Sequence, residues 1–285
     1  MSDLMQRIAA ISPERRELLA LRLKQKGTSL SSFPLSFAQQ RLWFIDQMEP
    51  GGTAYNIPTA FRLTGRLDRA VLARALTEVV RRHESLRTTF PSVDGRPAQV
   101  ISPPAPVELD AVDLSRLPVE EREEEARRLA AEEAQRPFDL AAGPLFRSSL
   151  IKLADDDHVV LVTMHHIVSD GWSVGILVSE LSALYAAFAR GEQSPLAELT
   201  IQYADFAAWQ RKHLTDEALE AQLAYWRERL SGAPPVLELP TDRPRPPVQT
   251  FRGSTHRFAL SAETSRAAAR LAEREGATPF MLLLA

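Results

Sequence analysis

The chain has 285 residues, of which 45% are hydrophobic and 25% charged, as in an ordinary soluble protein with a sizeable core. Its formal net charge of −3 argues against nucleic acid as the main partner, because phosphate backbones are bound by basic surfaces. The sequence contains no cysteine, which excludes a disulfide framework and a thiolate site and is compatible with the cytoplasmic location that we expect. We find no signal peptide and no run of about 18 apolar residues, so no membrane partner is expected.

The chain begins with a short segment that precedes the main domain. Residues 12–26 are predicted to form an amphipathic helix, because Ser12 can cap it and Pro13 suits its first position. The mostly polar residues 28–32 follow as a linker. We therefore assign residues 1–32 to a leader helix and linker.

From residue 33 to residue 190 the pattern alternates between helices and strands, which is typical of an α/β fold. Pro58 limits the first strand to the edge of a sheet, or else lies at the start of that strand. The dipeptide Asp94-Gly95 is a strong signal for a hairpin. Strands are expected at 57–63, 86–93, 97–101, 145–153 and 158–164, and helices at 68–83, 118–136 and 172–190.

The remaining residues, 191–285, differ in character. A proline-rich stretch at 239–249 predicts an extended linker. Helices are expected at 203–230 and 261–275, and a strand at 255–260. A last apolar helix starts at residue 278 and the sequence stops inside it, which predicts a truncated second lobe.

The sharpest chemical signal is the run His165-His166-Ile167-Val168-Ser169-Asp170-Gly171. It lies between an apolar strand and a helix, a junction that presents side chains at a cleft. A histidine there can act as a general base near neutral pH, because its unperturbed pKa is about 6.5. Residue types alone leave a structural histidine pair equally open. No third metal ligand stands at a suitable spacing, so no metal is expected.

Four segments resemble, in order and spacing, the motifs of condensation domains from non-ribosomal peptide synthetases. The third, MHHIVSDGWS at 164–173, resembles the defining motif of that family. The others are SFAQQRLWF at 36–44, RHESLRTTF at 82–90 and YADFAAW at 203–209. Four such segments in series are highly specific, and the resemblance spans nearly the whole chain from Phe33.

The resemblance implies an α/β, chloramphenicol-acetyltransferase-like fold of two lobes. Residues 33–190 would form the N-terminal lobe, and residues 191–285 the start of the C-terminal lobe. The later motifs of the family belong to that second lobe and are not in this sequence.

By the same resemblance, the domain joins a donor acyl or peptidyl thioester to the amine of an acceptor aminoacyl thioester. Donor and acceptor peptidyl carrier proteins present both substrates on 4'-phosphopantetheine arms, and the domain binds no cofactor of its own. An adenylation domain is expected downstream in the parent synthetase. The subtype indicated is the peptide-bond-forming one with an L-configured donor.

The resemblance also assigns catalytic roles to the motif. His166 lies nearest the reacting amine, either as its base or as a group that orients it, and His165 supports the loop. Asp170 shapes the site, and Gly171 gives the substrate close passage.

Four further residues are expected to support the site. The resemblance pairs Asp170 with an arginine of the second motif, for which Arg87 is favoured over Arg82. Trp172 and Ser173 line or buttress the site.

Three alternatives stay open at this point. An epimerisation domain shares the fold and the histidine motif, although residues 82–90 fit the peptide-bond-forming branch better. A heterocyclising relative would carry Asp in place of His165. A non-catalytic docking module would lack His166, although a truncated chain could bind carriers without catalysing a reaction.

Overall fold

The computed structural model describes residues 32–93, 95–214, 216–247, 253, 256 and 258–285. These residues divide between two compact units, one that ends at Ala233 and one that spans Pro234–Ala285. The predicted leader helix at 12–26 lies outside the described residues. The larger unit carries the histidine run.

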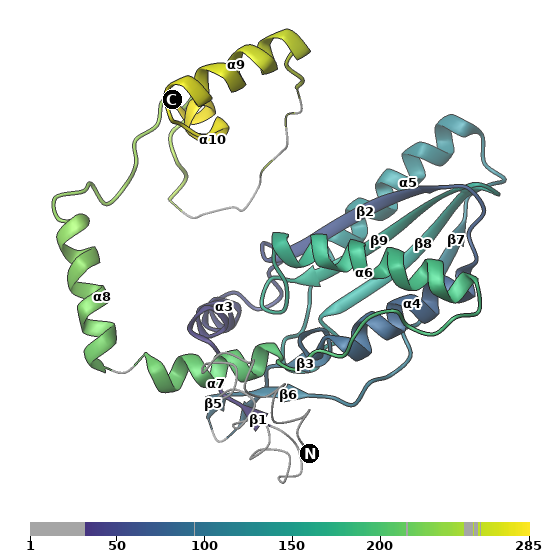
Figure 1. Ribbon diagram of the computed structural model, residues 1–285, viewed down its shortest axis with the longest axis horizontal. Coiled ribbons are helices and arrows are strands. Elements are labelled where there is room, and N and C mark those ends of the chain that lie inside the picture. The colour runs from purple at the N-terminus through teal and green to yellow at the C-terminus, as the bar shows by residue number, and fades with distance from the viewer. Residues whose placement is uncertain (1–31, 94, 215, 248–252, 254–255, 257) are drawn as a thin grey trace, which may run out of the picture. The chain divides into compact units, whose positions relative to one another are not determined.

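A four-stranded sheet in the order β2-β9-β8-β7 forms the centre of the larger unit (Figure 1). Its strands are β2 (Asn56–Thr64), β7 (Asp110–Asp113), β8 (Phe146–Ala154) and β9 (Asp157–His165). β9 pairs antiparallel with β2 on one side and with β8 on the other, while β7 pairs parallel with β8. β2 is an edge strand, which is one of the two placements that Pro58 allows, because proline cannot donate a ladder hydrogen bond to a further strand.

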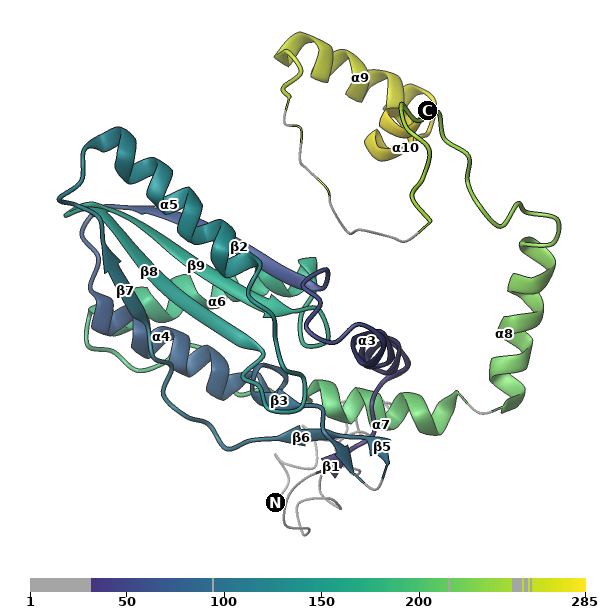
Figure 2. The same ribbon diagram turned by 180° about the vertical axis from the view of Figure 1, so that it is seen from behind.

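Three helices cover this sheet, two on one face and one on the other (Figures 1 and 2). They are α4 (Arg69–Arg82), α5 (Val119–Ala134) and α6 (Gly171–Ala189). α4 and α6 share one apolar core with the sheet, in which Leu76 and Leu184 are fully buried beside Val162 of β9. Each helix agrees with its predicted range to within two residues.

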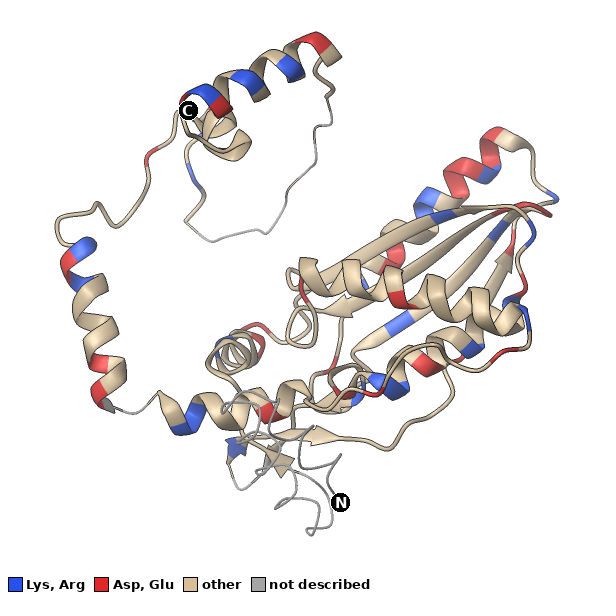
Figure 3. Ribbon diagram, in the orientation of Figure 1, with Lys and Arg blue, Asp and Glu red and all other residues tan. Residues whose placement is uncertain are grey.

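The helix α5 packs on the opposite face, where Leu129 lies with Ile151 and Leu161 of the sheet. Figure 3 shows that acidic and basic residues gather on α5. One of them, Glu123, pairs with Arg62 of β2 at 2.8 Å. The charged residues therefore belong to a solvated helix face.

Among the described helices, only α6 is long and apolar enough to cross a membrane. Its residues Leu177, Leu184 and Phe188 are buried in the same core as α4. One side of α6 therefore packs against the sheet within a globular unit, while Ile176 and Val178 on the same helix are exposed.

A smaller three-stranded sheet stands beside the main one, in the order β1-β6-β3. It consists of β1 (Ser32–Phe33), β3 (Thr88–Thr89) and β6 (Gln99–Ile101), and the hairpin β4 (Ser92–Val93) to β5 (Arg96–Pro97) continues from it. The predicted hairpin is confirmed, and Gly95 adopts the positive φ of 76° that its turn requires. The strand predicted from residue 86 begins only at Thr88, because residues Glu84–Arg87 form a short 3-10 helix, η1.

The chain after α6 departs further from the prediction. Residues 203–230 form two helices instead of one, α7 (Tyr203–His213) and α8 (Asp216–Arg229), because Leu214 leaves helical backbone geometry with ψ at 70°. The strand predicted at 255–260 is wrong where it can be judged, since residues 258–260 are described and form no strand.

The smaller unit contains the two helices predicted near the end of the sequence, α9 (Ala262–Arg274) and α10 (Pro279–Leu284). The lobe boundary that we predicted at residue 190 stays a prediction. α7 packs within the larger unit, where Tyr203 bonds to Ser36 at 3.0 Å, next to α3 (Phe37–Met48).

Candidate functional site

The strand β9 delivers the histidine run to the end of the main sheet. His165 is its last residue, and the backbone N–H of His165 donates to the carbonyl of Leu145 at 3.1 Å. The next N–H, that of His166, donates to the carbonyl of Tyr55 at 2.8 Å, on the other side of the strand. The loop therefore starts from a backbone that is held on both sides.

His165 is buried, with 4% of its surface exposed. Its Nδ1 accepts the N–H of Ile167 at 3.1 Å, and its ring lies edge-on to Phe138 with the centroids 6.1 Å apart. Burial, with a smaller contribution from the nearby His166, lowers the pKa of His165 to about 4. At neutral pH this imidazole is therefore uncharged, with Nδ1 engaged in shaping the turn.

His166 has the opposite environment. Its side chain is exposed, whereas the following Ile167 and Val168 are buried in an apolar cluster with Leu35 and Leu140. Burial of the two apolar neighbours fixes the loop and turns the imidazole of His166 outward. A ligand can therefore reach this ring, which is the exposed histidine of the run.

Asp170 caps the helix α6. Its Oδ1 accepts the N–H of Ser173 at 2.8 Å and the hydroxyl of Ser173 at 2.6 Å, and the Asp170 N–H donates back to Ser173 Oγ at 3.3 Å. These bonds from Ser173, supported by a smaller effect of His166, lower the pKa of Asp170. A carboxylate at a helix N-terminus also interacts favourably with the helix dipole.

The ion pair that we predicted between Asp170 and an arginine is not formed. Arg82 is buried, and its Nε donates to Oε1 of Glu180 at 3.0 Å. The ring of His83 bonds to the other oxygen of Glu180, with 2.7 Å between Nε2 and Oε2. Glu180 stands on α6 itself, so this helix is tied to the end of α4 through a carboxylate other than Asp170.

Arg87 also has other partners. Its guanidinium donates to the carbonyl of Ser102 and lies 3.5 Å from Oε1 of Glu84. Among the described residues, neither Arg82 nor Arg87 forms the predicted pair with Asp170. The physical reason is that both guanidinium groups are held elsewhere, Arg82 by Glu180 and Arg87 by Ser102 and Glu84.

Gly171 and Trp172 stand at the open side of the helix start. A Cβ added to Gly171 would meet no heavy atom within 4 Å. The side chain of Trp172 is 82% exposed, so it does not pack against the site as a buttress within the larger unit.

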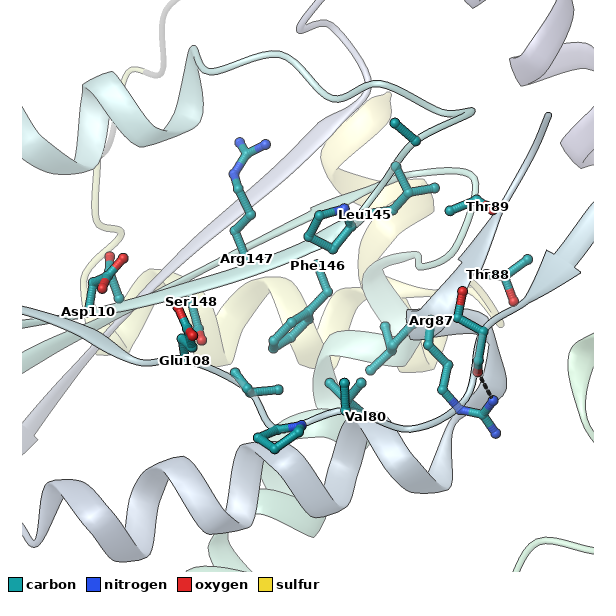
Figure 4. A pocket seen from close by; sticks show the side chains of 18 of the residues that line it. Val80, Arg87, Thr88, Thr89, Glu108, Asp110, Leu145, Phe146, Arg147 and Ser148 are labelled. Atoms are coloured by element: carbon teal, nitrogen blue, oxygen red, sulfur yellow. Dashed lines mark hydrogen bonds between the residues drawn. The ribbon is translucent and has the colours of Figure 1, made fainter.

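Two of the cavities in the larger unit bear on the question of where the site lies. The bigger one, of about 600 Å³, runs along β8 and the segment 102–110, and Figure 4 shows Arg87 at one end of it and Asp110 at the other. Its described lining includes no residue of the run 165–173. A smaller cavity of about 90 Å³ adjoins the run instead, and Ser169, Ser173 and His83 line it.

Some residues of the site lie outside all four sequence motifs. Tyr55 and Phe138 contact the ring of His165, and Glu180 receives Arg82 and His83. No local pattern points to them, because the contacts join residues that are far apart in the sequence. Within the described part of the chain, no three His, Asp or Glu side chains form a cluster that could hold a metal ion.

Comparison with known proteins identifies similar chains. The sequence profile of a family described as "Condensation domain" matches residues 30–285. A linear gramicidin synthase subunit of Brevibacillus parabrevis is 51% identical over 284 residues, which cover all of this chain and 5% of that protein. This chain is therefore similar to a small part of a much longer synthetase polypeptide.

Solved structures give the same result. The first condensation domain of the CDA synthetase matches with a TM-score of 0.72 and 28% identity, over 87% of this chain and 59% of that one. The X-domain from teicoplanin biosynthesis, solved in a complex with OxyB, matches with a TM-score of 0.73 and 34% identity, over 88% of this chain and 55% of that one. These likenesses confirm the predicted α/β, chloramphenicol-acetyltransferase-like fold.

The buried, neutral His165 predicts a specific loss of stability in mild acid. Its pKa of about 4 in the folded chain lies below the unfolded value of about 6.5, so the unfolded state takes up the proton first. The contribution of His165 is complete above pH 6.5 and falls, by up to about 1.4 kcal/mol per pH unit, as the pH drops towards 4. His165→Asn, which keeps an acceptor for the Ile167 N–H, should lack this fall. Urea unfolding at pH 7.5, 6.0 and 5.0 measures it, and equal pH slopes for both proteins would contradict the assignment.

The cap on α6 predicts different effects for two substitutions of Asp170. Asp170→Ala should lower the free energy of unfolding by about 1 kcal/mol, because the bonds to Ser173 are lost. Asp170→Asn should cost much less, because asparagine caps helices about as well as aspartate. Urea unfolding at pH 7 compares the two. If an ion pair were the important contact, Asn would be as harmful as Ala.

Proposed function

Because the chain belongs to the condensation domain family of non-ribosomal peptide synthetases, we propose that it forms an amide bond between two carrier-bound substrates. The acceptor amine attacks the carbonyl carbon of the donor thioester. A C–N bond forms and the C–S bond breaks. The donor thiolate leaves, and the amine loses one proton, which the thiolate finally receives.

The exposed imidazole of His166 is the observation that carries this proposal. It stands at the end of β9 on a loop that is held by Tyr55 and by two buried apolar residues. Such a ring can take the proton of the amine or accept a hydrogen bond that orients it. His165 cannot replace it, because its Nδ1 is engaged with Ile167 and its burial disfavours the charged form.

The other residues of the motifs hold the loop that carries this imidazole or leave room beside it for a substrate. His165 and Asp170 hold the two ends of the loop through the bonds described above. Gly171 leaves room for a substrate, and Trp172 offers an exposed aromatic surface beside it. Arg82 acts indirectly, by holding α6 through Glu180.

The substrates define the partners that we propose. Donor and acceptor peptidyl carrier proteins present them on 4'-phosphopantetheine arms, and an adenylation domain downstream loads the acceptor. We propose an L-configured donor and a cytoplasmic synthetase. These statements rest on the family and on relatives such as the gramicidin synthase, of which the chain spans 5%.

A binding role without catalysis is the second candidate. The likeness that favours it is the X-domain solved in a complex with OxyB. On this alternative, the chain would recruit a partner protein and His166 would have no chemical part.

Substitution of His166 separates the two candidates. His166→Ala should lower the rate of amide formation by about 10²–10⁴-fold if the imidazole transfers the proton. Some activity should remain, because holding two reactants together can contribute roughly 7–11 kcal/mol by itself. The measurement is mass spectrometry of product formed by the chain from one acyl-loaded and one aminoacyl-loaded carrier protein. His256→Ala, an exposed histidine outside the run, is the matched control.

Two outcomes would contradict the catalytic proposal. Equal rates for the wild type and His166→Ala would remove the histidine from the mechanism. Binding of loaded carriers with no product from the wild-type chain would favour the recruiting module.

Gly171→Ala tests whether substrate passes close to the helix start. The added methyl group meets no protein atom within 4 Å, so the fold should be as stable as the wild type. If the substrate uses this space, the rate of amide formation should fall at least about ten-fold, the effect of losing about 1.4 kcal/mol of transition-state binding. Product formation and thermal unfolding are measured on the same samples. An unchanged rate would place the substrate elsewhere.

A further inference from the structure

Ser169 has an unusual environment within the run 165–173. The residue is only 7% exposed, and its Oγ is buried with no hydrogen-bond partner in the described chain. Burying a hydroxyl without a hydrogen bond is costly, and buried polar groups in folded proteins almost always have a protein or water partner. This side chain therefore requires a partner other than those of the protein itself.

The cavity of about 90 Å³ next to Ser169 can supply that partner. Its lining combines apolar side chains with the polar residues His83, Ser85, Ser169 and Ser173. A water molecule occupies about 30 Å³ in the liquid and needs two to four polar partners when buried. The cavity has the volume for one to about three water molecules, and it has the polar groups to hold them.

His83 and Ser173 have the hydrogen-bonding capacity that such water needs. Nε2 of His83 bonds to the Glu180 carboxylate, which only accepts, so this nitrogen carries a hydrogen and Nδ1 can bond to water, as an acceptor in the neutral ring and as a donor in the charged one. The His83 Nδ1 has no partner among the described residues. Ser173 donates its hydroxyl hydrogen to Asp170 and accepts one N–H, which leaves one lone pair free.

We propose that ordered water in this cavity bonds Ser169 to His83, and thereby ties the loop that carries His166 to the end of α4. Ser169 is then a positioning residue for that imidazole, and only this last part depends on the proposed function. The water would join the second and third sequence motifs, and Glu180, which bonds to His83, would connect the same group to α6.

Hydrogen exchange of the loop amides tests the proposal without any substrate. Ser169→Ala removes the hydroxyl, and the His166 and Ile167 amides, which bond to Tyr55 and His165, should exchange on the order of ten-fold faster. Ser169→Thr keeps a hydroxyl and should restore slow exchange. Ser182→Ala is the matched control, because the Ser182 hydroxyl bonds only within α6. Unchanged exchange in Ser169→Ala would overturn the positioning role.

Thermal unfolding of the same variants tests the water itself. If Ser169 is bonded to water, Ser169→Ala should lower the Tm by about 2–4 °C, as expected for loss of one hydrogen bond in a unit of this size. If the hydroxyl has no partner, its removal should leave the Tm unchanged or raise it. A crystal structure should then show a water peak within hydrogen-bond distance of Ser169 Oγ, and a dry cavity would overturn the proposal. Neither measurement needs carriers or product, so failure of the condensation assay would leave this inference to be judged separately.

Discussion

The position of β9 between two antiparallel neighbours is the constraint on which the site depends. Its pairing continues to His165 on the β2 side and to Met164 on the β8 side, and the amides of His165 and His166 still bond to Leu145 and Tyr55, just before β8 and β2 begin. A strand held on both edges has little freedom, so the loop that follows it starts from a fixed point. The helix α6 fixes the other end of that loop, because Asp170 caps it and Leu177 and Leu184 bury it against the sheet. The few residues between the two ends can therefore present a side chain with a defined direction.

Environment gives the two adjacent histidines different properties. His165 lies in an apolar pocket of rings, and the cost of burying a charge lowers its pKa to about 4. His166, one residue later on the opposite side of the chain, remains in contact with solvent. An imidazole that remains neutral is a dependable hydrogen-bond acceptor within the loop, whereas a proton acceptor for a substrate must be accessible to it. The structure therefore gives the two histidines different environments, one buried and bonded within the loop and the other accessible from outside.

Glu180 is the carboxylate that joins the second motif to the helix α6. It accepts bonds from Arg82 and His83 while it stands on the helix that Asp170 caps. A buried ion pair of this kind is costly to desolvate and adds little net stability, but removing one partner leaves an unpaired buried charge. The pairing of Glu180 with Arg82 and His83 therefore matters mainly because it fixes the end of α4 against α6. The proposed water at Ser169 would hold the same region together, because it would bond the loop before α6 to His83 at the end of α4.

The sequence by itself determined the elements and the family. Pro58 at a sheet edge and Asp94-Gly95 in a turn each act through local backbone chemistry, which needs no distant partner. The four motifs, and with them the choice of His166 as the reactive candidate, were likewise available from the order of residues alone. Only the tertiary structure decided which carboxylate faces Arg82 and which rings enclose His165. It also decided that a predicted long helix divides at Leu214. These outcomes depend on groups brought together from as far apart as His83 and Glu180, and the energy of such contacts is set by burial and distance, which no local pattern encodes.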